Sequence, residues 1–250
     1  MKIVYNGEIL DESDSRVSIL SPGFNYGDGF FTTIKVINKN PKLFDLHLER
    51  IKKSLSFYEY DLKLPNFNQL ILELLEINDL NNSRLKIIFF RDVSKISYII
   101  YCNNLTEDSK PIELTLSKFI RGDEEIHRYK SLNYYSNLHN PYTLFKDWED
   151  RVLETGFANI FMIKDDHIFT PPITLPILPG VYRSFLLGIE NILGYKIREK
   201  EITVKELYSA DGIFLTNSIR EILPVKSFNK SIISTKIPVL IRKELCLQNH

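Results

Sequence analysis

The stretch Lys130-Ser131-Leu132-Asn133-Tyr134 decides the fold, together with Glu154-Thr155-Gly156-Phe157-Ala158-Asn159, whose glutamate lies 24 residues after the lysine. Two further stretches follow along the chain, Pro179-Gly180-Val181-Tyr182-Arg183 and Thr216-Asn217-Ser218. The first two stretches supply an amine and a carboxylate, whereas the last two offer backbone N–H groups and a hydroxyl that can bind an anion. This order indicates a site for amine chemistry.

Composition sets broad limits on the class of protein. The chain has 250 residues, 44% of them hydrophobic, which is enough for a substantial core in one large or two small domains. Thirty-two basic and thirty-two acidic residues cancel, so net charge favours binding neither to nucleic acid nor to a membrane surface. No run approaches eighteen apolar residues, and we expect a cytoplasmic protein.

The two cysteines do not indicate a disulfide framework or a metal site. Cys102 and Cys246 lie far apart, with no CxxC or Cys/His spacing between them. We expect both thiols to be reduced and no metal to be bound.

Periodicity in the first half indicates an α+β domain. Asn6-Gly7 predicts a tight hairpin, because this dipeptide supplies the positive φ angles of a type I′ turn. Apolar patterns then predict a strand, two helices and two more strands, over residues 30–37, 46–57, 70–77, 83–90 and 96–102. Thr106 to Pro111 is polar and linker-like, so we expect domains at 1–110 and 111–250.

The second half is expected to consist of strands with few helices. Alternation predicts a strand from Ile112, and later strands are expected at 158–163, 167–170, 213–216 and 222–225. A helix is predicted from Val181 to Leu193, with Gly194 as its C-terminal cap. Thr203 and Glu206 fit a capping box at the start of another helix.

Pyridoxal phosphate is the cofactor that these residues suit. It needs an amine for its aldehyde, a partner for its pyridine nitrogen, a cradle for its phosphate and a wall for its ring. Lys130 is the candidate amine and Glu154 the candidate partner of the nitrogen. The phosphate could be bound by the following residues: Arg50, Val181, Tyr182, Asn217 and Ser218.

Each of these residues also has an ordinary structural interpretation. A single lysine, glutamate or arginine is usually a solvated surface charge, and Pro-Gly often precedes a helix without any role in binding. Arg121 and Arg128 could receive a substrate carboxylate, and His47 or His139 could line the cleft, but surface positions are the simpler expectation. The order of the motifs must therefore decide.

That order resembles the fold-type IV pyridoxal-phosphate enzymes, the class IV aminotransferase superfamily. The resemblance covers almost the whole chain. It rests on six motifs in the family's order: Tyr26-Gly27-Asp28-Gly29-Phe30-Phe31-Thr32-Thr33, His47-Leu48-Glu49-Arg50, Lys130 to Tyr134, Glu154 with Asn159-Ile160-Phe161, Leu178-Pro179-Gly180-Val181-Tyr182-Arg183, and Ala210-Asp211 through Pro224-Val225.

The resemblance implies a small N-terminal α/β domain, a larger C-terminal β-barrel-like domain and a homodimer. It implies Lys130 as the Schiff-base lysine and Glu154 at the pyridine nitrogen. Around the phosphate it implies Arg50, Val181, Tyr182, Asn217 and Ser218. Phe31 and Thr33 would line the substrate side, where Phe31 lacks the hydroxyl of the tyrosine found in D-amino-acid transaminases.

The resemblance leaves the reaction open. The Gly-Asp-Gly-x-Phe-Thr-Thr form, with Thr32 where many relatives carry an acid, is similar to some 4-amino-4-deoxychorismate lyases, which release pyruvate to give 4-aminobenzoate in folate biosynthesis. A branched-chain or D-amino-acid transaminase and a non-catalytic diverged relative are the alternatives. The segment from Lys130 to Glu154 is shorter than usual in the family, Gly212 replaces a common acid, and Tyr182 replaces a common threonine.

Overall fold

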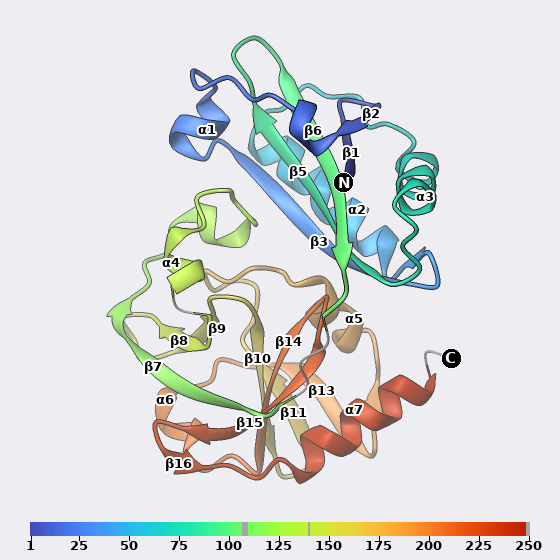
Figure 1. Cartoon of the computed structure of the whole chain (residues 1–250). Coiled ribbons are helices and arrows are strands. Elements are labelled where there is room, and N and C mark those ends of the chain that lie inside the picture. The colour runs from blue at the N-terminus through green and yellow to red at the C-terminus, as the bar shows by residue number, and fades with distance from the viewer. Residues whose placement is uncertain (107–109, 140, 249–250) are drawn as a thin grey trace. The chain divides into compact units, whose positions relative to one another are not determined.

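The computed structural model describes residues 1–106, 110–139 and 141–248, so the linker predicted from Thr106 to Pro111 lies partly outside the described residues. Two compact units are present (Figure 1). The first consists of Met1–Thr106 and Tyr129–Tyr134, and the second of Glu107–Arg128 and Tyr135–His250. The stretch that contains Lys130 therefore packs with the first unit, although it follows strand β7 (Ile112–Ile120) of the second.

The first unit is a six-stranded sheet with the strand order β2-β1-β6-β5-β3-β4. Its strands are β1 (Lys2–Tyr5), β2 (Glu8–Asp11), β3 (Gly29–Ile37), β4 (Asn40–Pro41), β5 (Ser83–Arg91) and β6 (Ile96–Asn104). Its helices are α1 (Pro22–Tyr26), α2 (Phe44–Phe57) and α3 (Phe67–Ile77), with a 3-10 turn at Glu12–Asp14. The hairpin, strands and helices predicted for this half are confirmed.

The core of this unit forms where α2 and α3 pack against one face of the sheet (Figure 1). Ile51 and Leu55 of α2 lie in one apolar cluster with Phe30 and Ile34 of β3. Side chains alternate along a strand, so Thr32, between Phe30 and Ile34, faces α2 as well. Phe31 and Thr33 point to the opposite face.

The second unit is built on a ten-stranded sheet that closes on itself. Hydrogen bonding runs β10-β14-β15-β7-β8-β9, and β9 pairs again with β10, which makes a barrel. These strands are β7 (Ile112–Ile120), β8 (Thr143–Lys146), β9 (Val152–Thr155), β10 (Asn159–Lys164), β14 (Gly212–Asn217) and β15 (Glu221–Phe228). Beyond this ring lie β11 (His167–Thr170), β12 (Asn191–Ile192), β13 (Tyr195–Glu199) and β16 (Ser231–Ile232).

The helices of the second unit are short except for the last. They are α4 (Tyr135–His139), α5 (Val181–Leu187), α6 (Val204–Leu207) and α7 (Lys236–Gln248), with a 3-10 turn at Glu125–Arg128. The Thr203–Glu206 capping box is present. Among the described residues, no helix is both long and apolar enough to cross a membrane.

The predicted length of the helix beginning at Val181 is wrong. Helix α5 ends at Leu187 with Gly188 as its cap, and the chain then forms the β12–β13 hairpin. Gly194 has φ +88° and lies in that hairpin turn, after Leu193 with φ +53°. A positive-φ glycine serves a hairpin as well as a helix C-terminus, so the sequence signal alone does not separate the two.

Candidate active site

The backbone of Lys130 is fixed by pairing with the beginning of β3. The N–H of Phe31 donates to the Lys130 carbonyl at 2.9 Å, and the N–H of Leu132 donates to the Gly29 carbonyl at 2.9 Å. Gly29 is needed here, because a Cβ at this position would overlap the Phe89 carbonyl and the Leu132 side chain. The first unit therefore places Lys130 directly beside Phe31.

The Lys130 amine lies among aromatic rings. Its Nζ donates to the Tyr134 hydroxyl at 3.1 Å and lies 4.8 Å from the centroid of the Phe31 ring. The Phe31 and Tyr134 rings meet edge to face, with centroids 5.2 Å apart. Nζ of Lys86 on β5 lies 4.3 Å from the same Phe31 ring, and burial together with Arg84 lowers the pKa of Lys86. Phe31 is therefore a buried wall beside two amines.

Arg50 on α2 lies beside Thr32 of the same unit. One guanidinium nitrogen donates to Thr32 Oγ1 at 2.8 Å, and the same oxygen lies 2.7 Å from Nδ1 of His47. Burial lowers the pKa of Arg50 to about 10, so the side chain stays cationic at neutral pH. His47 is buried rather than on the surface, which corrects the simpler expectation from the sequence.

The burial of His47 predicts a pH dependence of stability. Burial, with Arg50 and Lys130 nearby, holds the pKa of His47 well below its usual value of 6.5. Below about pH 6.5 the unfolded chain takes up a proton that the folded chain does not. The free energy of unfolding therefore falls as the pH is lowered, by at most about 1.4 kcal/mol per pH unit. We expect urea unfolding of His47→Asn to show a smaller loss than the unsubstituted chain between about pH 6.5 and 5.

His127 in the second unit also has a lowered pKa, chiefly through burial, and adds to the slope of both proteins. It does not affect the difference between them. Equal slopes for the two proteins would contradict a neutral, buried His47.

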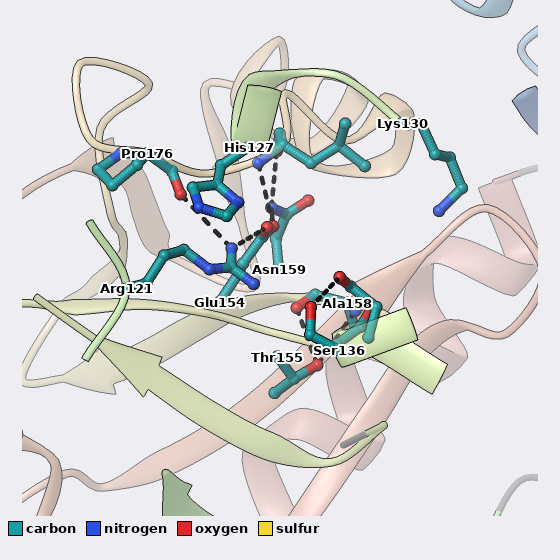
Figure 2. A network of polar contacts seen from close by, with 12 residues as sticks. Arg121, His127, Lys130, Ser136, Glu154, Thr155, Ala158, Asn159 and Pro176 are labelled. Atoms are coloured by element: carbon teal, nitrogen blue, oxygen red, sulfur yellow. Dashed lines mark hydrogen bonds and ion pairs between the residues drawn. The ribbon is translucent and has the colours of Figure 1, made fainter. Parts of the chain in front are cut away.

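Glu154 lies in the second unit, where β9 closes the barrel against β10. Arg121 Nη1 donates to Glu154 Oε1 at 2.7 Å, and the amide of Asn159 donates to Oε2 at 3.0 Å (Figure 2). The Leu178 N–H donates to Oε2 at 3.2 Å. The side chains of Arg121 and Glu154 are only 5% and 7% exposed, so this is a buried ion pair. Arg121 also lies over the Phe145 ring, at 4.2 Å.

Arg121 is the site residue that the sequence did not reveal. It was expected on the surface or facing a substrate carboxylate, whereas it pairs with Glu154. Arg128, the other arginine considered, bonds to Asp123 and to the Thr174 carbonyl. The sequence around Arg121 does not indicate whether the arginine is buried with a carboxylate or exposed to solvent. Its partner, Glu154, lies 33 positions away.

Gly180 allows the start of α5 to approach Asn159 closely. A Cβ at Gly180 would overlap Asn159 Oδ1, whose amide also donates to the Leu178 carbonyl at 2.9 Å. The N–H groups of Val181 and Tyr182 open the helix and have no partners within it. The Tyr182 ring is buried, and the pKa of its hydroxyl is raised chiefly by this burial and next by the charge of Glu221. The backbone N–H of Tyr182, rather than its side chain, is thus the group that could bind an anion at the start of the helix.

Replacing Gly180 by alanine is expected to disturb this corner. The added methyl group must displace Asn159 and so loosen the hydrogen bond to Glu154, which we expect to cost about 1–3 kcal/mol. The measurement is the free energy of unfolding in urea. Gly188→Ala is the matched control, because its Cβ would meet nothing closer than the Phe185 carbonyl at 3.3 Å. Equal effects of the two substitutions would show that the approach to Asn159 is not tight.

The turn after β14 holds two further predicted residues, Asn217 and Ser218. Asn217 Oδ1 accepts the N–H groups of Ile219 and Arg220 at 3.0 and 2.8 Å, so this side-chain oxygen shapes the turn. The neighbouring Thr216 pairs with Asn159 across β14 and β10. Its buried Oγ1 has no hydrogen-bond partner within the described part of the chain. A buried hydroxyl without such a partner is a group that a polar ligand atom could satisfy.

The structure thus brings the sequence-predicted residues together in two groups. Phe31, Thr33, Arg50 and Lys130 belong to the first unit, with Thr33 buried opposite Lys86 in the β3–β5 register. The second unit contains Glu154, Val181, Tyr182, Asn217 and Ser218. Arg183 of the same motif is structural, since it bonds to the Pro171 carbonyl and to Glu199.

Comparison with known proteins identifies the family of the chain. The family model for amino-transferase class IV matches residues 29–228. The chain belongs to the class IV aminotransferase family. Its relatives include a putative branched-chain-amino-acid aminotransferase of Methanocaldococcus jannaschii, 27% identical over 98% of this chain and 94% of that protein. The aminodeoxychorismate lyase of Bacillus subtilis is also 27% identical, over 89% of this chain and 85% of that protein.

The solved structures agree on the fold of this family. A putative 4-amino-4-deoxychorismate lyase from Legionella pneumophila superposes with a TM-score of 0.85 at 24% identity, covering 96% of each chain. The predicted fold-type IV fold, with a small α/β domain and a barrel-like domain, is confirmed. So is the prediction of an enzyme of this class IV family.

Proposed function

We propose that this class IV enzyme uses pyridoxal 5′-phosphate and acts on an amino-acid-like substrate. The observation that carries the proposal is the buried Glu154, whose carboxylate is held by Arg121, Asn159 and the Leu178 N–H. A buried carboxylate fixed as an anion is what a protonated pyridine nitrogen requires. Each unit also offers a group that suits a phosphate: Arg50 is a cation of the first unit, and in the second unit the Thr216 hydroxyl has no hydrogen-bond partner among the described residues.

When bound, the cofactor supplies an aldehyde that condenses with amines and a ring that accepts electrons. The chain's own residues supply the rest. Lys130 offers Nζ as the amine for the aldehyde and as the base that moves the substrate proton. Tyr134 and the Phe31 ring orient Nζ, and Glu154 maintains negative charge for the pyridine nitrogen.

The remaining sequence-predicted residues would bind the two ends of the ligands. We assign the phosphate to Arg50, the backbone N–H groups of Val181 and Tyr182, and Asn217 and Ser218. Phe31 and Thr33 would face the substrate. Because Phe31 has no hydroxyl, it can shape the substrate side but cannot donate a hydrogen bond there.

Of the possible reactions we favour the lyase that converts 4-amino-4-deoxychorismate to pyruvate and 4-aminobenzoate, a step of folate biosynthesis. Support comes from the Gly27-Asp28-Gly29 and Thr32-Thr33 form of the first motif and from the relative in Bacillus subtilis. A branched-chain or D-amino-acid transaminase is the second candidate, since the Methanocaldococcus jannaschii relative is equally similar. We further propose a cytoplasmic homodimer with domains at 1–110 and 111–250.

Two assays test this proposal in order. Purified protein that is mixed with pyridoxal phosphate and then separated from unbound cofactor should remain yellow, and a colourless protein that takes up no cofactor would contradict the cofactor assignment. Holoenzyme given aminodeoxychorismate should then release pyruvate. Formation of 2-oxo acids from L- or D-amino acids without pyruvate release from aminodeoxychorismate would replace the lyase by the transaminase.

A further inference from the structure

Arg50 is a cation that pairs with no carboxylate of the described residues. Among the ion pairs formed by residues 1–106, 110–139 and 141–248, none includes Arg50. Its guanidinium donates instead to the neutral hydroxyl of Thr32 at 2.8 Å. The positive charge of Arg50 is therefore oriented but not neutralised within the first unit.

The hydroxyl of Thr32 is itself oriented by His47. Arg50 can only donate, so the Thr32 oxygen is the acceptor of that bond. The same oxygen lies 2.7 Å from Nδ1 of His47, and the tautomer of the ring decides which of these two atoms donates. Burial, with Arg50 and Lys130 nearby, lowers the pKa of His47 well below its usual value, which favours the neutral ring. The chain of hydrogen bonds runs from Arg50 through Thr32 to His47.

The fold places these three side chains together. His47 and Arg50 are three residues apart on α2, which puts them on one face of the helix. Thr32 is 1% exposed and points from β3 toward that face. The Nε2 atom of His47 is buried with no hydrogen-bond partner among the residues that the structure describes. Within that part of the chain, Nδ1 makes the only polar contact of the His47 side chain, and packing holds the rest of the ring.

We propose that Thr32 and His47 are positioning residues that aim Arg50 at a ligand phosphate through a neutral hydrogen-bond chain. The inference rests on the proposed function, in which Arg50 binds the cofactor phosphate. A phosphate monoester carries about −1.5 to −2 charge at pH 7, so an arginine that keeps its full charge binds it more strongly than one paired with an acid. Thr32 orients the guanidinium without this neutralisation.

The test compares two ligands that differ only in the phosphate. Thr32→Val has nearly the same shape as threonine but lacks the hydroxyl. We expect it to raise the dissociation constant for pyridoxal phosphate about tenfold, the size of a hydrogen bond to a charged group, and to leave that for pyridoxal within about twofold. Thr32→Ser keeps the hydroxyl and should restore binding of pyridoxal phosphate.

A second cycle links the effect to Arg50. In an Arg50→Met background, Thr32→Val should change the affinity for pyridoxal phosphate by less than about twofold, because the group that it orients is gone. Equal losses for both ligands, or full additivity with Arg50→Met, would overturn the inference. An unsubstituted chain that binds neither ligand would contradict the proposed function itself, whereas normal binding by Thr32→Val would refute only the role of Thr32.

Discussion

Replacing Lys130 by alanine is expected to lower turnover at least about a thousandfold, because the substitution removes both the amine for the cofactor and the base that moves the substrate proton. The backbone pairing of residues 130–132 with β3 does not involve the side chain, so the fold should persist. Turnover is measured as pyruvate release, or as 2-oxo acid formation if the transaminase assay is the positive one. Circular dichroism checks the fold.

Lys95→Ala is the matched control for this prediction. Lys95 is an exposed lysine in the turn between β5 and β6 of the same unit and contributes nothing to the proposed site. Its substitution should leave turnover within about twofold. A Lys130→Ala protein that is folded and keeps turnover comparable to that of the control would mean that another group performs the chemistry.

Replacing Glu154 by glutamine is expected to reduce both stability and activity. The substitution keeps the shape of the side chain but leaves Arg121 as an uncompensated buried charge, which costs about 3–5 kcal/mol. Both side chains are below a tenth exposed, so solvent screens this effect little. Turnover should fall at least about a hundredfold, because the negative charge for the pyridine nitrogen is lost. Urea unfolding and steady-state turnover measure the two effects.

A double substitution separates the two consequences. In Glu154→Leu with Arg121→Met no buried charge is left unpaired, so stability should recover in part while turnover stays low; Asn159 and the Leu178 N–H still lose the carboxylate oxygen that accepts from them. Glu113→Gln breaks an exposed pair with Lys226 and should change stability by less than about 1 kcal/mol. A stable and fully active Glu154→Gln protein would show that the buried pair has neither role.

Much of the fold follows from the sequence because its signals are local. Strand β3 and strands β5 and β6 combine β-branched or aromatic residues with clear turn residues, and α2 has apolar residues at helical spacing. The predicted end of α5 is wrong because Gly194 suits a hairpin turn as well as a helix cap. A local pattern indicates which conformations a residue can adopt, and the pairing of strands such as β12 and β13 in the folded chain selects one of them.

The polar partners of the site could not be predicted in the same way. Arg121 meets Glu154 because β8 pairs with both β7 and β9, and strand order around a barrel is not visible in either segment. Thr32 and His47 lie in recognised motifs, but their hydrogen bond requires α2 to pack on one face of β3. The motifs therefore predict which residues belong to the site. Which polar groups lie next to those residues, and how they are oriented, depends on long-range packing.

Reductive trapping tests directly whether Lys130 is the lysine that bonds to the cofactor. Holoenzyme is treated with borohydride, which fixes a carbon–nitrogen double bond between cofactor and lysine as a stable amine, and peptides are then mapped by mass spectrometry. We expect a phosphopyridoxyl group on the peptide that contains Lys130, and none on that peptide of Lys130→Ala. The same group on Lys86 or on another lysine, with Lys130 unmodified, would rule out Lys130 as the Schiff-base lysine.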